Sequence, residues 1–493
     1  MLVGRVLALG LNLVSQIIIV RYLAKSDYGA FAYVYSLVML FKGLALLGLP
    51  DTVVRYLPLY RERAEPGSIL GTLVFSLAVV AGVGALLAIA FITVLASGAS
   101  WLTNDPSVAQ LALVLAFLIP LEALNELLTP VFAVFTHYRA IFFRKWILAP
   151  ALRFGVVVTM VILDAGVLAL ASGYLVASAI GVAVYLRMLS GVARAEMWNT
   201  VPRRAYHIEL RELLTFAGPV LVTGLVWLVI ESTDAILLGW FHSAQAVAEF
   251  RAVMPISRLT QVVILSFAVV YTPLAARAFA RDDTDGITDL YWQSAAWICV
   301  LTFPVFLLTC PFAAPLTTLL FGERYAGAAP VMALLSLAYF IPSALGFNGA
   351  TLKVYRKLRY SLAIDCGAAS ANFVLSLLLI PLWGPVGAAA ATCATMVIYN
   401  ALRQYGLGRF TPVTTFPRSQ VRLYLSMLIV AAALFGTQAW LRPGIGGVAL
   451  LTAAGSAMVG LVALRTLRLE STFPELLRVP MLRTLLRPFM GPA

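Results

Sequence analysis

FAYVYSLVMLFKGLALLGL, residues 31–49, is largely apolar, yet it carries Lys42 near its middle. A run of this length and composition crosses the ~30 Å hydrocarbon core of a bilayer as a helix. A charge inside such a helix is expensive, and it usually faces a bundle interior or a watery cavity on a transport path. A second run, Val247–Leu274, contains Arg251 and Arg258 in the same kind of setting. The two runs predict a membrane protein that carries an anionic compound.

Composition supports the membrane assignment. The chain has 493 residues, of which 61% are hydrophobic and 12% charged, and its mean hydropathy is +0.94. A soluble domain contains roughly 25% charged residues. The longest stretch that could lie wholly in water, Met188–Glu212, is shorter than the ~50 residues of a small folded domain. We therefore expect an all-α integral membrane protein that is not an enzyme.

The remaining apolar runs extend this interpretation along the whole chain. Cutting the sequence into runs of ~20 residues gives about fourteen transmembrane segments. The segments are 2–20, 31–54, 69–97, 108–136, 146–163, 167–186, 213–240, 247–275, 290–320, 328–352, 360–381, 385–402, 423–441 and 445–464. Pro120 and Pro130 interrupt the fourth segment, and each removes a helical hydrogen bond and permits a bend there.

The loops between these segments alternate in charge. Most of the 35 Lys and Arg residues fall in every second loop and in the tail. Cytoplasmic loops carry such an excess in membrane proteins, so we expect both termini to be cytoplasmic and the chain to lie in the cell inner (plasma) membrane. The net charge of +13 is then explained by anionic membrane lipids, and it does not indicate a nucleic-acid partner.

An internal repeat predicts how the helices are grouped. Arg21–Tyr33 follows the first segment and Gly239–Ala252 follows the seventh, and each is a short outer turn that leads into a helix rich in small and aromatic residues. Two six-helix lobes related by an axis along the membrane normal would follow, with two further helices after them. We expect an N-terminal lobe at 1–200, a C-terminal lobe at 201–408, and helices 13 and 14 with a cytoplasmic tail at 409–493.

The repeat also brings cations from both halves to similar depth. Aligning Phe31 with Phe250 places Lys42 and Arg258 about one helical turn apart in depth. Both would then point toward one central space. Each cation has an alternative role, because it could pair with a buried carboxylate or extend its head to the interface. For Arg251, only a few residues into its segment, the interface is an equal alternative.

Acidic residues inside the segments are candidates for ion coupling. Glu231 and Asp234 are three apart and share a helix face, and they lie in the same half of the chain as Arg258. We expect one of them to bind a coupling H⁺ or Na⁺. A fixed ion pair is the alternative for Glu231, and it is favoured for Asp365 and for the acids of the fourth segment. Those acids, Glu122 and Glu126, are expected to face Arg153 on the next segment.

The sequence gives no sign of a metal or a cofactor. The four cysteines lie within segments without metal-ligand spacing, and the three histidines are scattered. No GxxxxGK[ST] phosphate-binding loop is present, so direct use of ATP has no site. An ion gradient or consumption of the product outside would have to supply the energy.

Several short motifs, in this order and spacing, resemble those of a known family. They are Arg21–Tyr35, Leu47–Pro50, Phe216–Pro219, Asp234–Gly239, Leu320–Tyr325, Ala371–Asn372 and Ile380–Thr392. Together they cover nearly the whole chain. They resemble bacterial polysaccharide flippases, the O-antigen and exopolysaccharide branch of the multidrug/oligosaccharidyl-lipid/polysaccharide exporter superfamily.

The resemblance implies a two-lobed bundle of fourteen helices. Such a protein moves polyprenyl-diphosphate-linked oligosaccharide from the inner to the outer leaflet by alternating access, for polysaccharide export. It also implies a cation-rich substrate cavity, which we assign to Arg21, Lys42, Arg251 and Arg258. Membrane lipids are expected partners, together with a polysaccharide polymerase or glycosyltransferases. A multidrug or organic-cation antiporter of the same superfamily is the alternative function, although its cavity would be dominated by acids.

Overall fold

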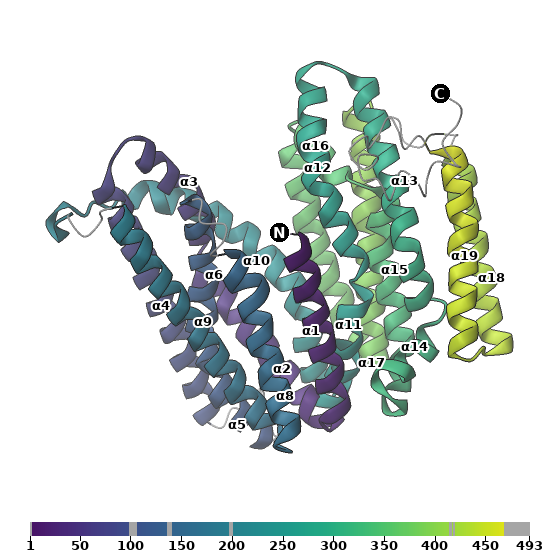
Figure 1. Ribbon diagram of the computed structural model, residues 1–493, viewed down its shortest axis with the longest axis horizontal. Coiled ribbons are helices and arrows are strands. Elements are labelled where there is room, and N and C mark those ends of the chain that lie inside the picture. Colours follow the sequence, from purple (N-terminus) through teal and green to yellow (C-terminus); the bar gives the residue numbers. More distant parts are fainter. Residues whose placement is uncertain are drawn as a thin grey trace. The chain divides into compact units, whose positions relative to one another are not determined.

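The chain is built of long helices (Figure 1). This computed structural model describes residues 2–97, 106–135, 141–196, 201–413, 417 and 420–467, and within them every regular element is a helix. The predicted all-α class is therefore confirmed. Met1 and residues 468–493, which belong to the two termini predicted to be cytoplasmic, lie outside the described residues.

Contacts divide the chain into two compact units, Met1–Ala252 and Val253–Ala493. The helices of the first unit are α1 (Leu2–Tyr22), α2 (Lys25–Leu46), α3 (Leu49–Glu62), α4 (Pro66–Ala96), α5 (Pro106–Ala116), α6 (Leu118–Val134), the π-helix η1 (Phe142–Leu148), α8 (Ala149–Ile162), α9 (Val167–Ala195), η3 (Arg203–Ala205), α10 (Leu210–Phe241) and the first part of α11 (Ala244–Ser257). Those of the second unit are α12 (Thr260–Ala280), α13 (Thr284–Thr309), α14 (Ala313–Phe321), η4 (Glu323–Ala328), α15 (Ala329–Leu345), α16 (Asn348–Val354), α17 (Leu358–Phe410), α18 (Val421–Leu441) and α19 (Ile445–Thr466).

The seventh predicted span packs with the first unit. Its helix, α10, lies against α2 and α3. Glycines allow this close approach, since a Cβ on Gly43 would collide with Leu228 and one on Gly239 with Tyr33. The compact first unit consequently ends after Ala252, whereas the lobes inferred from the repeat divide at residue 200. The lobe boundaries at 200 and 408 rest on the repeat and stay predictions.

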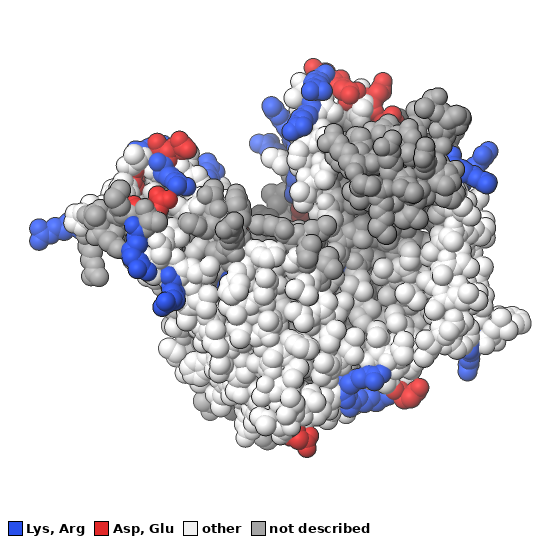
Figure 2. Space-filling view, in the orientation of Figure 1, with Lys and Arg blue, Asp and Glu red and all other residues white. Residues whose placement is uncertain are grey.

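Many helices, alone or joined to a neighbour, are long and apolar enough to cross a bilayer. In the described residues, ten helices meet this condition, and the bent pair Val108–Ala116 and Leu118–Val134 makes up to eleven. On the face drawn in Figure 2, the charged side chains of each unit gather toward the helix ends and leave a broad band largely without charge. Each of the fourteen predicted segments overlaps one helix or consecutive helices, and the eleventh and twelfth share α17. The total of fourteen spans stays a prediction.

Proline and glycine explain where these helices break. The bent pair turns by 41° after Ala116, because Pro120 has no N–H to donate to the carbonyl of Ala116. The long helix α17 contains a kink at Gly384, which has a φ of 55° and lies between Pro381 and Pro385. Only glycine adopts this conformation at low cost. The kink falls between two predicted segments, 360–381 and 385–402, so α17 corresponds to both.

Apolar packing of α3, α4 and α6 sets the orientation of α6. The buried core between them includes Leu57 on α3, Leu73 on α4, and Leu127, Leu128 and Val131 on α6. Residues three or four apart on a helix share a face. The opposite side of α6, which carries its acidic residues, is thereby turned away from this core.

Candidate functional site

A cavity of about 350 Å³ opens between α3, α6 and η1 in the first unit. Its lining combines acidic, basic and amide side chains. The lining residues are Pro50, Asp51, Val54, Glu122, Asn125, Glu126, Thr129, Pro130, Arg144 and Lys145. Such a mixed lining inside an apolar bundle is expensive, and in membrane proteins polar groups of this kind usually serve a function.

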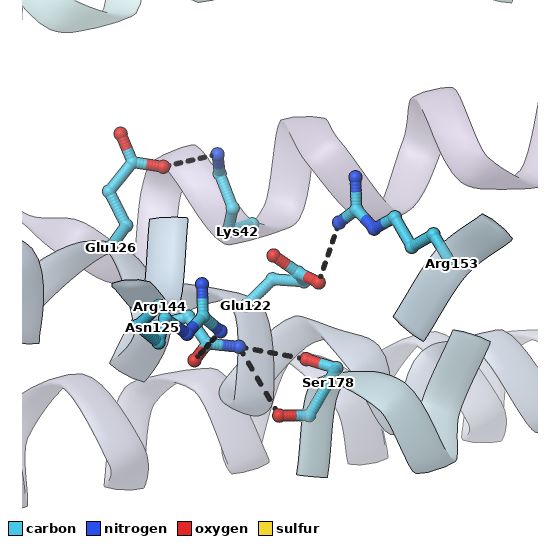
Figure 3. Close-up of polar contacts among 7 residues, drawn as sticks. All are labelled: Lys42, Glu122, Asn125, Glu126, Arg144, Arg153 and Ser178. Atoms are coloured by element: carbon cyan, nitrogen blue, oxygen red, sulfur yellow. Dashed lines mark hydrogen bonds and ion pairs between the residues drawn. The ribbon is translucent and has the colours of Figure 1, made fainter. Parts of the chain in front are cut away.

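One face of α6 supplies the centre of this site. Glu122, Asn125, Glu126 and Thr129 follow one another at steps of three, one and three residues along the helix. This spacing aligns them on one helix face. We use "the polar cluster" for the seven side chains drawn in Figure 3, namely Lys42, Glu122, Asn125, Glu126, Arg144, Arg153 and Ser178.

Lys42 on α2 forms an ion pair with Glu126. Its Nζ lies 2.6 Å from Oε2 of Glu126 (Figure 3). The lysine side chain is 19% exposed, whereas that of Glu126 is 53% exposed. Pairing with a carboxylate is the alternative role that the sequence left open for Lys42. The pair does not exclude an additional role in substrate binding, because the carboxylate remains open to the cavity.

Arg153 on α8 forms the second ion pair of the polar cluster. Its Nη2 lies 3.1 Å from Oε1 of Glu122, which confirms the partner expected for this acid. The guanidinium also lies 5.5 Å from the ring centroid of Tyr174. A partly buried charge with both a carboxylate and an aromatic face around it is well compensated.

Arg144 is the most buried cation of the polar cluster, with an exposed fraction of 9%. It donates a hydrogen bond to Oδ1 of Asn125, and Asn125 in turn donates to Oγ of Ser178 over 2.9 Å. The guanidinium lies 4.7 Å from the ring centroid of Tyr185. Gly181 leaves room for it, because a Cβ there would lie 2.2 Å from Nη2.

Sequence reasoning missed this role of Arg144. Arg144 falls in the loop between the predicted segments 108–136 and 146–163, whereas in the structure it lies on the π-helix η1. π-Helical turns are rare and occur often at functional sites. Within the described part of the chain, no carboxylate lies within ion-pair distance of Arg144. The available signal was the polar face of α6, whose Asn125 requires a buried partner.

The remaining predicted site residues lie elsewhere. Arg21 is exposed at the end of α1. Arg251 on α11 donates from Nη2 to the carbonyl oxygen of Glu231 over 3.4 Å, so these two predicted residues are neighbours. Glu231 is exposed, and Asp234 is only 5% exposed on the same helix.

Arg258 belongs to the second unit. Its Nε donates to the hydroxyl of Tyr339 over 2.7 Å, and its guanidinium lies 5.0 Å from the centroid of the same ring. The convergence of Arg258 with Lys42 on one space stays a prediction.

The two helix starts of the internal repeat lie side by side in the first unit. Nζ of Lys25 is 2.5 Å from Oε1 of Glu249. A Cβ on Gly29 would collide with the carbonyl oxygen of Ala244, so the backbones of α2 and α11 are in direct contact. Both turns had been predicted to lie on the outer side of the membrane.

These features define a multi-pass helical membrane protein with a charged cluster beside a cavity in its first unit. A family model described as "Polysaccharide biosynthesis protein" matches residues 18–330. This match spans more than half of the chain, which therefore belongs to the polysaccharide biosynthesis protein family. The resemblance inferred from the sequence motifs is confirmed.

Two curated relatives match in part. One is the "Uncharacterized membrane protein MJ1068" of Methanocaldococcus jannaschii, 26% identical over 186 residues, which are 37% of this chain and 36% of that protein. The other is the "Probable low-salt glycan biosynthesis flippase Agl15" of Haloferax volcanii, 20% identical over 260 residues, which are 52% of this chain and 55% of that protein. The matches thus span about a third and about half of the length of these relatives.

Solved structures share the fold. The lipid II flippase MurJ in an inward closed conformation aligns with a TM-score of 0.70 and 10% identity, covering 94% of this chain and 98% of that one. An inward-facing multidrug resistance transporter of the MATE family aligns with a TM-score of 0.58 and 14% identity, covering 87% and 95%. At identities of 10% and 14%, both structures establish the fold and do not establish the substrate.

Proposed function

We propose that this protein is a flippase for polyprenyl-diphosphate-linked oligosaccharide in polysaccharide export. Membership of the polysaccharide biosynthesis family supports a role in glycan assembly. The matching relative from Haloferax volcanii is described as a probable glycan biosynthesis flippase, and the fold is shared with a lipid II flippase. The observation that carries the proposal is Lys42, a cation within an apolar helix whose partner Glu126 lines an open cavity.

The chemistry of the substrate explains why cations are required. A diphosphate headgroup with attached sugars must lose its hydration to pass between leaflets, whereas the polyprenyl chain remains in lipid. Lys and Arg side chains replace water around phosphate oxygens, and Arg adds bidentate hydrogen bonds. Binding of this kind lowers the barrier to crossing without cleaving any bond. The protein would accordingly act as a transporter and not as an enzyme.

The substrate site in this proposal comprises Arg21, Lys42, Arg251 and Arg258. Lys42 has the strongest structural support, because it lies in the membrane-spanning part of α2 and beside a cavity. Alternating access between two lobes would expose these side chains first to the cytoplasm and then to the outer side. Both termini would be cytoplasmic, in the cell inner membrane.

An ion gradient would drive the cycle. Glu231 and Asp234 are the proposed coupling acids for H⁺ or Na⁺, and the burial of Asp234 favours it over the exposed Glu231. A gradient is worth about 2.3 kcal/mol per charge for each 100 mV of membrane potential. A polysaccharide polymerase or glycosyltransferases would receive the product on the outer side or supply the substrate on the inner side.

An organic-cation antiporter is the second candidate. The cavity lining favours it in one respect, because Asp51, Glu122 and Glu126 could attract a cation. Two of these acids are already paired with Arg153 and Lys42, which weakens this candidate. The fold does not distinguish a flippase from an antiporter, since a multidrug transporter shares it.

Reconstitution into liposomes separates the two candidates. The purified protein is offered a fluorescent polyprenyl-diphosphate oligosaccharide in one set of vesicles and a fluorescent organic cation in another. We expect protein-dependent movement of the lipid-linked glycan between leaflets and no uptake of the cation. Movement of the cation alone would replace the flippase proposal by the antiporter.

A further inference from the structure

The ion pair between Lys42 and Glu126 places an acid where a substrate phosphate would have to bind. An ammonium is a compact charge with three donors, and here one of them is held by Oε2 of Glu126 at 2.6 Å. A phosphate that approached Lys42 would lie next to this carboxylate. Two unit charges of like sign at 4 Å repel by about 4 kcal/mol at an effective dielectric constant of 20.

The other two cations of the polar cluster, Arg153 and Arg144, differ from Lys42 in how their partners are exposed to the cavity. Glu122 is 17% exposed and is held by Arg153. Among the residues that the structure describes, Arg144 donates to an amide oxygen and lies over an aromatic ring, with no carboxylate in contact, and its Nε makes no hydrogen bond. Within the polar cluster, the pair of Lys42 and Glu126 alone combines a largely buried cation with a carboxylate that is 53% exposed and lines the cavity. A proton from water can reach this carboxylate without any rearrangement of helices.

The charged and titratable groups around Glu126 come from six helices. They are Lys42 and Tyr35 on α2, Asp51 on α3, Glu122 on α6 itself, Arg144 and Lys145 on η1, Arg153 on α8, and Tyr185 on α9. The neighbouring helices α4 and α5 contain no acidic or basic residue. Of these groups, Lys42 is the one in direct contact with the carboxylate of Glu126.

We infer that Glu126 is a proton-linked mask for Lys42, which means that its carboxylate prevents Lys42 from binding an anion until the carboxylate takes up a proton. With Glu126 ionised, its carboxylate accepts a hydrogen bond from the Lys42 ammonium. When a proton converts that carboxylate to a neutral carboxyl group, Lys42 keeps its own proton and turns its N–H groups to a phosphate oxygen of the incoming diphosphate. Anion binding is then accompanied by the uptake of a proton.

The linkage also runs in the reverse direction. If protonation of Glu126 favours anion binding, anion binding must favour protonation by the same factor. Release of the headgroup would return Lys42 to Glu126 and expel the proton. This inference rests on the proposed function, because it takes the phosphate of a lipid-linked substrate as the ligand. It adds Glu126 to the proposed coupling acids Glu231 and Asp234.

Binding of farnesyl diphosphate to the full-length protein in lipid nanodiscs tests the inference. Calorimetry at several pH values, in buffers with different ionisation enthalpies, reports both affinity and proton uptake. As the pH rises, we expect the affinity of the wild type to fall more steeply than that of Glu126→Gln. The difference in slope should reach up to about tenfold per pH unit. The glutamine variant should bind tightly throughout and take up fewer protons. Because the probe itself titrates, only the difference between the two proteins counts.

Two further variants test whether the effect of Glu126→Gln comes from the loss of the Glu126 carboxylate and not from misfolding or from a general change in charge. Glu126→Asp keeps a carboxylate and should retain the proton uptake, and a normal thermal unfolding transition shows that each variant is folded. Glu62→Gln is the matched control, because Glu62 is an exposed acid at the end of α3 and does not line the cavity. It should also retain the proton uptake.

The outcomes separate this inference from the proposed function. If wild type and Glu126→Gln bind the probe with the same pH dependence and the same proton uptake, the mask is wrong and the flippase proposal stands. If the wild type binds no probe at any pH and moves no lipid-linked glycan, both fall. Inorganic diphosphate in a parallel titration identifies the source of the phosphate. If inorganic diphosphate binds as tightly as farnesyl diphosphate, the ligand of the masked Lys42 is the phosphate alone. If it binds more weakly, the ligand is the headgroup of a lipid.

Discussion

Two ion pairs, one in each unit, use the same chemistry in different surroundings. In the second unit, Nη2 of Arg403 lies 2.7 Å from Oδ1 of Asp365, and the two side chains are 14% and 13% exposed. In the first unit, Glu126 faces Lys42 at 2.6 Å but is 53% exposed. The difference lies in what else holds the carboxylate.

The carboxylate of Asp365 is held from several sides. The hydroxyl of Tyr399 donates to it over 3.1 Å, and the Arg403 guanidinium lies 4.1 Å from the ring centroid of Tyr399. Gly349 provides the space, since a Cβ there would collide with Nη1 of Arg403. Asp365 and Arg403 also lie on opposite sides of the kink at Gly384, so the pair joins the two halves of α17. We conclude that it fixes structure, whereas the pair at Lys42 can exchange partners.

Removal of Arg403 should have the largest effect on stability. Arg403→Ala leaves Asp365 buried without its cation, and breaking a buried pair costs about 3–5 kcal/mol. We expect a clear loss of thermal stability in detergent and low abundance in the membrane. Arg409→Ala, an exposed arginine at the end of the same helix, is the control and should unfold like the wild type.

A double replacement tests whether the charge itself is needed. Arg403→Met combined with Asp365→Leu removes both charges and should recover most of the lost stability, because packed apolar residues can replace a buried pair. An Arg403→Ala protein with unaltered thermal stability would contradict the structural role of this pair and remove the contrast with Lys42.

Lys42→Ala should have a small effect on stability and a large effect on transport, the opposite of Arg403→Ala. Because Glu126 is half exposed, it stays solvated after the change, and we expect a stability loss of about 1 kcal/mol or less. Loss of one hydrogen bond to a charged phosphate should lower the rate of glycan flipping by roughly ten- to 150-fold. The liposome flipping assay and thermal unfolding on the same preparation measure both effects.

The control for Lys42→Ala is Arg281→Ala, an exposed arginine next to the end of α12. It should flip lipid-linked glycan at the wild-type rate. If Lys42→Ala also kept that rate, the cation would be structural, and the two ion pairs would no longer differ in kind.

The sequence predicted the fold and one of the two pairs in the polar cluster. Apolar run length alone located the helices, because hydrocarbon thickness fixes the length of a span. The Glu122–Arg153 pair was foreseen because both residues lie inside neighbouring apolar segments. The pairing of Lys42 with Glu126 depends on how α2 rotates against α6, which side-chain packing determines and periodicity does not. Arg144 was missed because a π-helix has no sequence signature distinct from a basic loop.

Two glycines on α9, Gly181 and Gly191, allow a test of the contacts made by Arg144. Gly181→Ala would bring a Cβ within 2.2 Å of Nη2 of Arg144, so the guanidinium must move away from Tyr185 and Asn125. Overpacking of this kind costs about 1–3 kcal/mol. Gly191→Ala is the matched change on the same helix, where nothing lies within 4 Å of the added Cβ. It should stabilise the helix by about 0.5–1 kcal/mol.

Thermal unfolding of the two alanine variants measures this difference. We expect opposite shifts, down for Gly181→Ala and up for Gly191→Ala. Equal shifts for both variants would mean that Arg144 adapts without loss and that its contacts with Asn125 and Tyr185 are not needed for folding.

The smallest effect is expected at a third ion pair, which lies at the surface of the first unit. Nη2 of Arg61 is 2.9 Å from Oε1 of Glu196, and the two side chains are 42% and 32% exposed. Pairs of this kind contribute about 0–1 kcal/mol, and salt screens them. Arg61→Ala should therefore leave flipping unchanged and lower the unfolding temperature slightly, and only at low ionic strength. The distances in all three pairs are similar, so a ranking of Arg403, Lys42 and Arg61 by stability loss would show that burial of the carboxylate, and not the length of the contact, determines how strongly each pair supports the fold.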